Sequence, residues 1–159
     1  MEFVQALLGN NVGQILSALG IAVAVFASGT GSARGVGVAG EAAAALVKEK
    51  PEHFVQAMVL QLLPATQGLY GFVTGFFILI NTQSGMDTSL GWYYFMASLP
   101  VAIAGMTSAP AQGRVSAAGM QILAQRPENS TQGIIFSAMV ETYAILGFAT
   151  SMLMILLHS

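Results

Sequence analysis

The chain has 159 residues, of which 55% are hydrophobic and 8% charged, with 18 glycines, no cysteine and a formal net charge of −2. Its mean hydropathy of +0.70 is typical of a polytopic membrane protein rather than a water-soluble domain. The lack of cysteine excludes disulfides, thiolate metal sites and thiol nucleophiles, and two histidines leave little for a catalytic triad or zinc. The sequence has no run of basic residues mixed with aromatic residues, so we do not expect it to bind nucleic acid.

Four long apolar stretches predict four membrane-spanning helices, at about residues 12–47, 54–81, 90–125 and 131–158. Each stretch is longer than the ~20 residues that a helix needs to cross a ~30 Å hydrocarbon core. The connections between the stretches are short and leave no room for a soluble domain. We therefore expect an all-α membrane protein of four transmembrane helices, arranged as two tandem helical hairpins over residues 1–81 and 82–159.

The basic residues lie in or towards the first and third connections, and they are Arg34, Lys48, Lys50, Arg114 and Arg126. The N-terminus, the middle connection and the C-terminus have none. Short loops rich in Lys and Arg stay on the cytoplasmic side of a membrane. We therefore expect a multi-pass protein of the cell membrane, with cytoplasmic first and third connections and both termini outside.

The two predicted hairpins are copies of one another. An offset of 76 residues aligns them without a gap, and it pairs Gly29 with Gly105, Ser32 with Ser108, Pro51 with Pro127, Thr66 with Thr142 and Gly71 with Gly147. Since an even number of spans separates the copies, both have the same orientation, which makes this a parallel duplication. At this offset Glu141 aligns with Ala65, so the chain keeps one deep carboxylate for four helices.

Small residues form two stripes along the first predicted helix. One stripe consists of Gly31, Gly35 and Ala39, and the neighbouring one consists of Gly29, Ala33 and Gly37. Such stripes allow helix backbones to approach closely. Two of them on one helix indicate more than one neighbour, which favours a ring of repeated hairpins over an isolated bundle.

Glu141 lies within an apolar run, residues 133–157, that is long enough to cross a bilayer. A charged side chain at the middle of a membrane costs from ~3 to more than ~10 kcal/mol, so it is retained where it has a partner or a task. We therefore take Glu141 as the centre of the candidate functional site.

The second predicted helix offers Glu141 several partners on a single face. At the spacing of one helix face lie Leu63, Thr66, Gln67 and Tyr70. Tyr70 is placed to donate its hydroxyl to Glu141. Pro64 interrupts the same turn, and by helix geometry it frees the carbonyl of Leu60 and loosens those nearby. Backbone carbonyls of this turn therefore become available as ligands.

The third predicted helix adds Gln112. Counting residues from the cytoplasmic connections places Gln112, Gln67 and Glu141 at a similar depth, ~15–20 Å into the membrane, so they can meet near its midplane. Together with Thr66 and a carbonyl they form an all-oxygen set with one negative charge, which suits a monovalent hard cation, because Ca²⁺ or Mg²⁺ would need more charge or water. Taken singly, each amide or hydroxyl is also explained by hydrogen bonding between helices.

Four motifs together resemble those of a known family. They are GSARGVGVAG, LPATQGLYGF, APAQGR and VETYAILGF, one in each helix. They are similar to the proteolipid c-ring subunit (subunit K) of V-type rotary ATPases, most closely the sodium-translocating bacterial form, over essentially the whole chain. The resemblance implies a Na⁺ site formed by the Leu63 carbonyl, Thr66, Gln67, Gln112 and Glu141, with Tyr70 bonded to the carboxylate. Helix geometry leaves open whether Leu60 or Leu63 supplies the carbonyl.

The resemblance also implies a mechanism. Identical subunits would form a rotor ring in the lipid membrane, with the first and third helices inside and the second and fourth outside. Glu141 would load Na⁺ from the cytoplasmic side, and the neutral ion pair would face lipid as the ring turns. A stator subunit would supply an arginine that helps to release the ion. Central-stalk subunits would belong to the same complex, and a distant soluble sector would hydrolyse ATP, so the chain itself would not be a catalyst.

Three other interpretations remain open. The same ring could carry protons, which need only Glu141 and would leave Thr66, Gln67 and Gln112 idle. A small four-helix multidrug exporter also uses a membrane glutamate, but keeps it in the first helix and lacks this duplication. A purely structural membrane pore or scaffold would give Glu141 no role.

Overall fold

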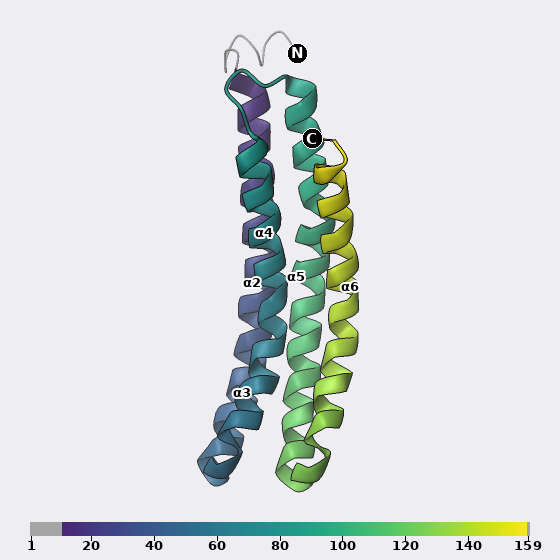
Figure 1. Ribbon diagram of the computed structural model, residues 1–159. Coiled ribbons are helices and arrows are strands. Elements are labelled where there is room, and N and C mark those ends of the chain that lie inside the picture. The colour runs from purple at the N-terminus through teal and green to yellow at the C-terminus, as the bar shows by residue number, and fades with distance from the viewer. Residues whose placement is uncertain (1–10, 159) are drawn as a thin grey trace.

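The computed structural model describes residues 11–158, and its regular elements are all helical. Four long helical segments run side by side (Figure 1). The first is α2, Val12–Glu49, and the second is divided into α3, Phe54–Leu62, and α4, Thr66–Asn81. The third is α5, Thr88–Gln125, and the fourth is α6, Ser130–Leu156. The predicted all-α fold of two tandem hairpins is thus confirmed.

Both hairpin turns lie at one end of the bundle, and the α4–α5 connection lies at the other (Figure 1). Each turn begins with a proline in a single turn of 3₁₀ helix, Pro51–His53 (η2) in the first hairpin and Pro127–Asn129 (η4) in the second. Proline suits the first position of a helix, where its missing N–H would have no partner. The predicted outward position of the termini concerns in part residues 1–10 and 159, which lie outside the described residues.

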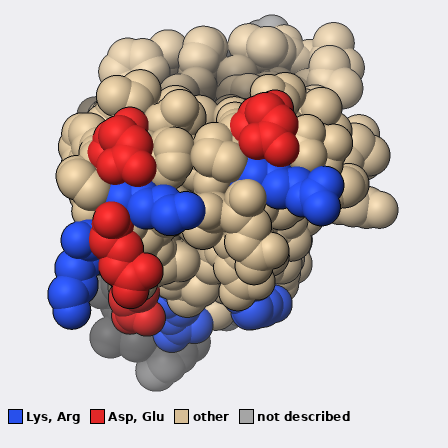
Figure 2. Space-filling model, turned by 90° about the horizontal axis from the view of Figure 1, so that it is seen from below, with Lys and Arg blue, Asp and Glu red and all other residues tan. Residues whose placement is uncertain are grey.

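Charged side chains gather at the end that carries the hairpin turns (Figure 2). The turns and the helix ends beside them contribute Lys48, Glu49, Lys50, Glu52, Arg126 and Glu128. Lys50 also joins the two hairpins, because its ammonium donates a hydrogen bond to the carbonyl of Ala124 near the end of α5. A cation at this position offsets the negative end of the helix dipole.

At the opposite end, Asp87 begins α5 as its N-cap. Its carboxylate accepts hydrogen bonds from the hydroxyl of Ser89 and, at 3.3 Å, from the Ser89 amide, and these bonds lower the pKa of Asp87. Ser17 of α2 and Thr82 after α4 share a hydrogen bond at the same end. Side-chain hydrogen bonds therefore fix the α4–α5 connection against the helices beside it.

Three segments are long and apolar enough to cross a membrane, namely Val12–Glu49, Pro51–Asn81 and Pro127–Leu156. The third predicted span, residues 90–125, falls within α5, which does not meet this criterion although it is 38 residues long. α5 contains Pro100, Pro110 and the buried Gln112, which lower its hydropathy. Its neighbours α2 and α6 cover these groups, so its place in the bundle depends on packing more than on its own hydropathy.

Large apolar side chains face outward on α4 and α6. The exposed fraction is 61% for Leu69, 59% for Phe72 and 64% for Leu146. A continuous apolar exterior of this kind is unfavourable in water and typical of a surface that contacts lipid.

α2 packs most extensively against α5, and glycines allow this contact. A Cβ added at Gly31 would lie 2.5 Å from the carbonyl oxygen of Gly105, and one at Gly35 would meet the backbone of Ala109. Only hydrogen at these positions lets the two backbones touch. The second predicted stripe is open: within the described chain no atom lies within 4 Å of a Cβ at Gly29 or Gly37.

The apolar core is divided between the two ends of the bundle. Near the hairpin turns it consists of Ala43, Leu46, Ala57, Leu60, Met120 and Leu123, and near the other end of Ile78, Met86, Tyr94, Ala97 and Ile155. Between these clusters, buried polar side chains such as Gln67, Gln112, Ser116 and Ser137 occupy the interior. The bundle therefore has a polar layer in its middle.

The α2–α5 contact predicts the effect of a single added methyl group. Gly35→Ala should lower the stability of the purified protein by about 1–3 kcal/mol, because its Cβ would overlap backbone atoms that cannot move aside. Thermal unfolding in detergent measures this effect. Gly37→Ala, two residues further along α2 with no atom of another helix nearby, is the matched control when both variants are measured as dissociated single chains. An equal loss in both variants would contradict the packing described above.

Candidate functional site

The second helical segment is broken at Pro64. α3 ends at Leu62, a 3₁₀ turn (η3) covers Leu63–Ala65, and α4 begins at Thr66. Proline has no N–H to donate and its ring collides with the carbonyl four residues before it, which disfavours a continuous α-helix. The chain instead forms a tighter turn, in which the amide of Thr66 bonds the carbonyl of Leu63.

This turn presents a backbone carbonyl next to a hydroxyl. Thr66 Oγ1 donates to the Leu63 carbonyl oxygen at 3.0 Å and lies 3.4 Å from Gln67 Oε1. The break therefore brings three oxygens together: the Leu63 carbonyl, the Thr66 hydroxyl and the Gln67 side-chain amide oxygen. Ideal helix geometry points to the carbonyl of Leu60, whose side chain packs in the apolar cluster near the hairpin turns, one turn before the break. The Leu63 carbonyl is the one that Thr66 contacts.

Two fully buried amides continue the network into α5. Gln67 Nε2 donates to Gln112 Oε1, and Gln112 Nε2 donates to Glu141 Oε2 at 3.3 Å. Both glutamine side chains are 0% exposed. A buried amide without partners would cost free energy, so each glutamine stabilises the other's orientation.

Glu141 reaches this network from α6 and is half-buried. Its Oε1 accepts a hydrogen bond from the hydroxyl of Tyr70 at 2.6 Å, and its Oε2 accepts the bond from Gln112. The ring of Tyr70 stacks on Phe148, with 5.0 Å between the ring centroids. Two donors from two different helices thus fix both oxygens of the carboxylate.

All six residues predicted for the site come together in one connected network, although they lie on three helical segments. They are Leu63, Thr66, Gln67, Tyr70, Gln112 and Glu141. Their role as ion ligands stays a prediction. A buried hydrogen bond of 2.8 Å between Ser116 and Ser137 joins α5 to α6 one turn away from Glu141. The small side chains at this contact keep the two helices close.

Sequence reasoning misses one contact of the broken helix. Ser32 of α2 hydrogen-bonds the backbone at Ala65 and Gly68, on either side of Thr66 and Gln67. The sequence shows Ser32 only as a member of the repeat, because a serine in a stripe of small residues looks like a packing residue. The signal that could have found it is the amide of Gly68, which the proline break leaves in need of an acceptor.

The atoms of the network that could bind a metal ion are oxygens, and together they carry one formal negative charge. The described residues contain no group of three or more His, Cys, Asp and Glu side chains close enough to hold a metal ion. A carboxylate, a hydroxyl, amide oxygens and a backbone carbonyl suit a hard cation of single charge.

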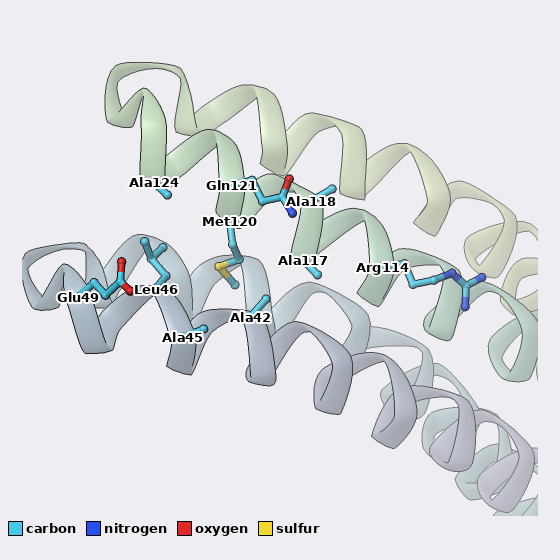
Figure 3. A pocket seen from close by; sticks show the side chains of 10 residues that line it. All are labelled: Ala42, Ala45, Leu46, Glu49, Arg114, Ala117, Ala118, Met120, Gln121 and Ala124. Atoms are coloured by element: carbon cyan, nitrogen blue, oxygen red, sulfur yellow. The ribbon is translucent and has the colours of Figure 1, made fainter.

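A groove of about 550 Å³ lies elsewhere, between α2 and α5 near the hairpin turns (Figure 3). Small and apolar residues line most of it, with Glu49 towards one end and Arg114 towards the other. A smaller hollow of about 300 Å³ lies between α2 and α3. Neither hollow is lined by a residue of the network, so the candidate site is a polar layer within the helices rather than either of these hollows.

Comparison with known proteins supports the duplication. The family model for the C subunit of ATP synthase matches the chain twice, at residues 19–78 and 95–154. Both the starts and the ends of these segments are 76 residues apart, which is the offset predicted from the sequence. Each match covers one hairpin.

Three relatives extend over most of the chain. V-type sodium ATPase subunit K of Enterococcus hirae is 57% identical over 150 residues, which cover 94% of this chain and 96% of that protein. A-type ATP synthase subunit K of Methanocaldococcus jannaschii is 38% identical over 89% of this chain and 62% of its own length. The 16 kDa proteolipid of the V-type proton ATPase of Ovis aries is 22% identical over 92% of this chain and 94% of its own length.

The repeated family match, the close relative and the two-hairpin fold agree with one another. The chain therefore belongs to the family of the ATP synthase C subunit, as a V-type proteolipid of the membrane rotor ring.

Proposed function

We propose that this chain is the sodium-carrying subunit of its rotor ring. Each copy binds one Na⁺ through Glu141, Gln112, Gln67, Thr66 and the Leu63 carbonyl, and carries it across the membrane as the ring turns. ATP hydrolysis takes place in a separate soluble sector, and this chain is not a catalyst. The observation that carries the proposal is the hydrogen-bond network that joins Glu141 to the oxygens of the broken helix.

Charge neutrality explains why the ion is needed. A carboxylate that faces lipid without a partner is costly, and one monovalent cation cancels its charge. Thr66 Oγ1 donates its proton to the Leu63 carbonyl and lies beside the Gln67 amide oxygen. A cation bound among these oxygens takes the place of the hydroxyl hydrogen between them. The Thr66 hydroxyl then rotates so that its lone pairs face the ion.

Tyr70 holds the carboxylate in place during loading and release. Its hydroxyl bonds Glu141 Oε1, while Gln112 bonds Oε2. An arginine from a stator membrane subunit would compete for the same carboxylate and favour release of the ion, since guanidinium binds carboxylate through paired hydrogen bonds. The partners are therefore identical ring subunits, the stator subunit, the subunits of the central stalk and membrane lipid.

The choice of sodium over protons depends on the surplus of oxygen atoms. A proton needs Glu141 alone, whereas two fully buried amides stand in the network, Gln112 bonded to Glu141 and Gln67 bonded to Gln112. The relative at 57% identity is named as a sodium ATPase subunit, and the relative named as part of a proton ATPase is 22% identical. A proton-carrying ring is the second candidate, and the family match argues against a multidrug exporter.

The orientation in the membrane follows from the charged end of the bundle. The hairpin turns with Lys48, Lys50 and Arg126 face the cytoplasm by the positive-inside rule, and the α4–α5 connection faces outward. Each hairpin, residues 1–81 or 82–159, is one unit of the repeat. The open stripe at Gly29 and Gly37 is then available to a neighbouring subunit.

Sodium should protect Glu141 from chemical modification. A hydrophobic carbodiimide labels membrane carboxyl groups in their protonated form, and bound Na⁺ keeps Glu141 unprotonated. We expect labelling of the purified ring to slow with added NaCl but not with KCl at the same ionic strength. Glu141→Gln, which removes the target, defines the background. Equal labelling with and without Na⁺, at a pH where protons do not compete, would favour the proton-carrying ring.

Removing single oxygen ligands should weaken Na⁺ binding without disrupting the ring. Thr66→Ala and Gln112→Ala should each raise the Na⁺ concentration that gives half-maximal protection by about tenfold, as expected for a lost ligand worth about 1.4 kcal/mol. Thr142→Ala is the matched control, since Thr142 is the repeat counterpart of Thr66 and bonds the carbonyl of Met139 within α6. Wild-type affinity in both site variants would show that the ligands are wrongly assigned.

Loss of the tyrosine hydroxyl should expose the carboxylate. In the absence of Na⁺, Tyr70→Phe should speed carbodiimide labelling of Glu141 by a few fold. The variant loses one hydrogen bond to the carboxylate, and solvent replaces part of that bond's free energy. Tyr143→Phe is the control, because Tyr143 is two residues from Glu141 but is 69% exposed. The rates are compared by mass spectrometry of the labelled chain, and identical rates for both variants and wild type would contradict a holding role for Tyr70.

A further inference from the structure

Ser32 of α2 makes two hydrogen bonds to the backbone of the broken helix. Its hydroxyl accepts from the amide of Gly68 at 2.7 Å and donates to the carbonyl of Ala65 at 3.3 Å. The side chain is 7% exposed. The hydroxyl of Ser32 thus both donates and accepts a hydrogen bond, and both bonds run from α2 to the second helical segment.

The two backbone groups that Ser32 holds lie directly on either side of Thr66 and Gln67. α4 begins at Thr66, and its N-cap residue, Ala65, has no side chain that could accept a hydrogen bond. The first amides of a helix have no carbonyl partner within that helix, and a serine at the N-cap usually supplies one. Here the serine comes from α2, so Ser32 caps α4 from a neighbouring helix.

Close approach of the backbones makes this cap possible. A Cβ added at Gly68 would lie 3.2 Å from both Cβ and Oγ of Ser32. Glycine at position 68 therefore leaves room for the serine to reach the backbone. The counterpart of Gly68 at the 76-residue offset is Ala144, which has a Cβ at this place.

The second half of the chain has a serine at the equivalent position, but that serine does not cap a helix. Ser108 is the counterpart of Ser32, is 8% exposed, and is the one buried side chain among the described residues whose polar atom has no hydrogen-bond partner. The counterpart of Pro64 is Val140, and α6 continues through it without a break. A continuous helix satisfies its own amides, so Ser108 has no free backbone group to cap.

We propose that Ser32 is a positioning residue for the ion site, an inference that rests on the proposed function. By capping α4 from α2, it fixes the backbone that carries Thr66 and Gln67 and thereby sets their distance to Glu141. It touches no ion itself. Its contribution is to the affinity for Na⁺ more than to the reactivity of Glu141, because the residues whose backbone it holds, Thr66 and Gln67, donate to neither oxygen of Glu141, whereas Tyr70 and Gln112 do.

Ser32→Ala in the assembled ring tests the proposal. The Na⁺ concentration for half-maximal protection of Glu141 against carbodiimide should rise about fivefold, the effect of losing a typical helix cap. The labelling rate and its pH profile without Na⁺ should be unchanged. Ser32→Cys keeps a small but weaker hydrogen-bonding group, and its affinity should lie between those of wild type and Ser32→Ala. If Ser32→Ala yields no ring, Ser32→Cys decides alone.

Two further serines separate positioning from general packing. Ser28, one turn earlier on α2, donates to the carbonyl of Val101 at 3.0 Å, so Ser28→Ala should lower the thermal stability of the ring and leave Na⁺ affinity unchanged. Ser108→Ala should change neither. An equal loss of affinity in Ser28→Ala and Ser32→Ala, or wild-type affinity in Ser32→Ala, would overturn the role of Ser32. Absence of Na⁺ protection in wild type itself would instead overturn the proposed function.

Discussion

The structure depends on holding one partly buried carboxylate in an apolar bundle. Glu141 is retained because Tyr70 and Gln112 donate to its two oxygens, and because Gln67 in turn orients Gln112. A charge at this depth without such donors would be too costly to keep. Small residues bring the helices close around the acid, and the serine pair at Ser116 and Ser137 joins α5 to α6 beside it.

The two halves of the duplicated chain contribute different parts of one hydrogen-bond network. The first half has Pro64, and with it the broken helix that presents Leu63, Thr66 and Gln67, whereas the second half has Val140 at the equivalent place and an unbroken α6. The acid occurs only in the second half, since Ala65 stands where Glu141 would be repeated. Gln112 is likewise matched by Val36. Neither hairpin alone contains the full network, so the four-helix chain is the smallest complete unit.

Much of this arrangement could be predicted because polar atoms stand out in an apolar sequence. Helical spacing placed Thr66, Gln67 and Tyr70 on one face, and counting residues placed Gln112 and Glu141 at their depth. Which carbonyl joins the network could not be derived from helical spacing, since Pro64 tightens the helix into a 3₁₀ turn and changes which carbonyl each amide bonds. The membrane position of α5 was predicted from its length, although neighbouring helices rather than hydropathy keep it in place.

Under the proposed function, a single ion site for four helices has a consequence for energy transfer. In the proposed ring, each full turn would carry as many ions as there are chains, which is half the number that one acid per hairpin would give. The free energy of the ATP hydrolysed in that turn would then be divided among fewer ions, and each ion could be moved against a steeper gradient. With Ala65 rather than a second acid in the first half, the proposed ring would move fewer ions per turn and could sustain a steeper gradient.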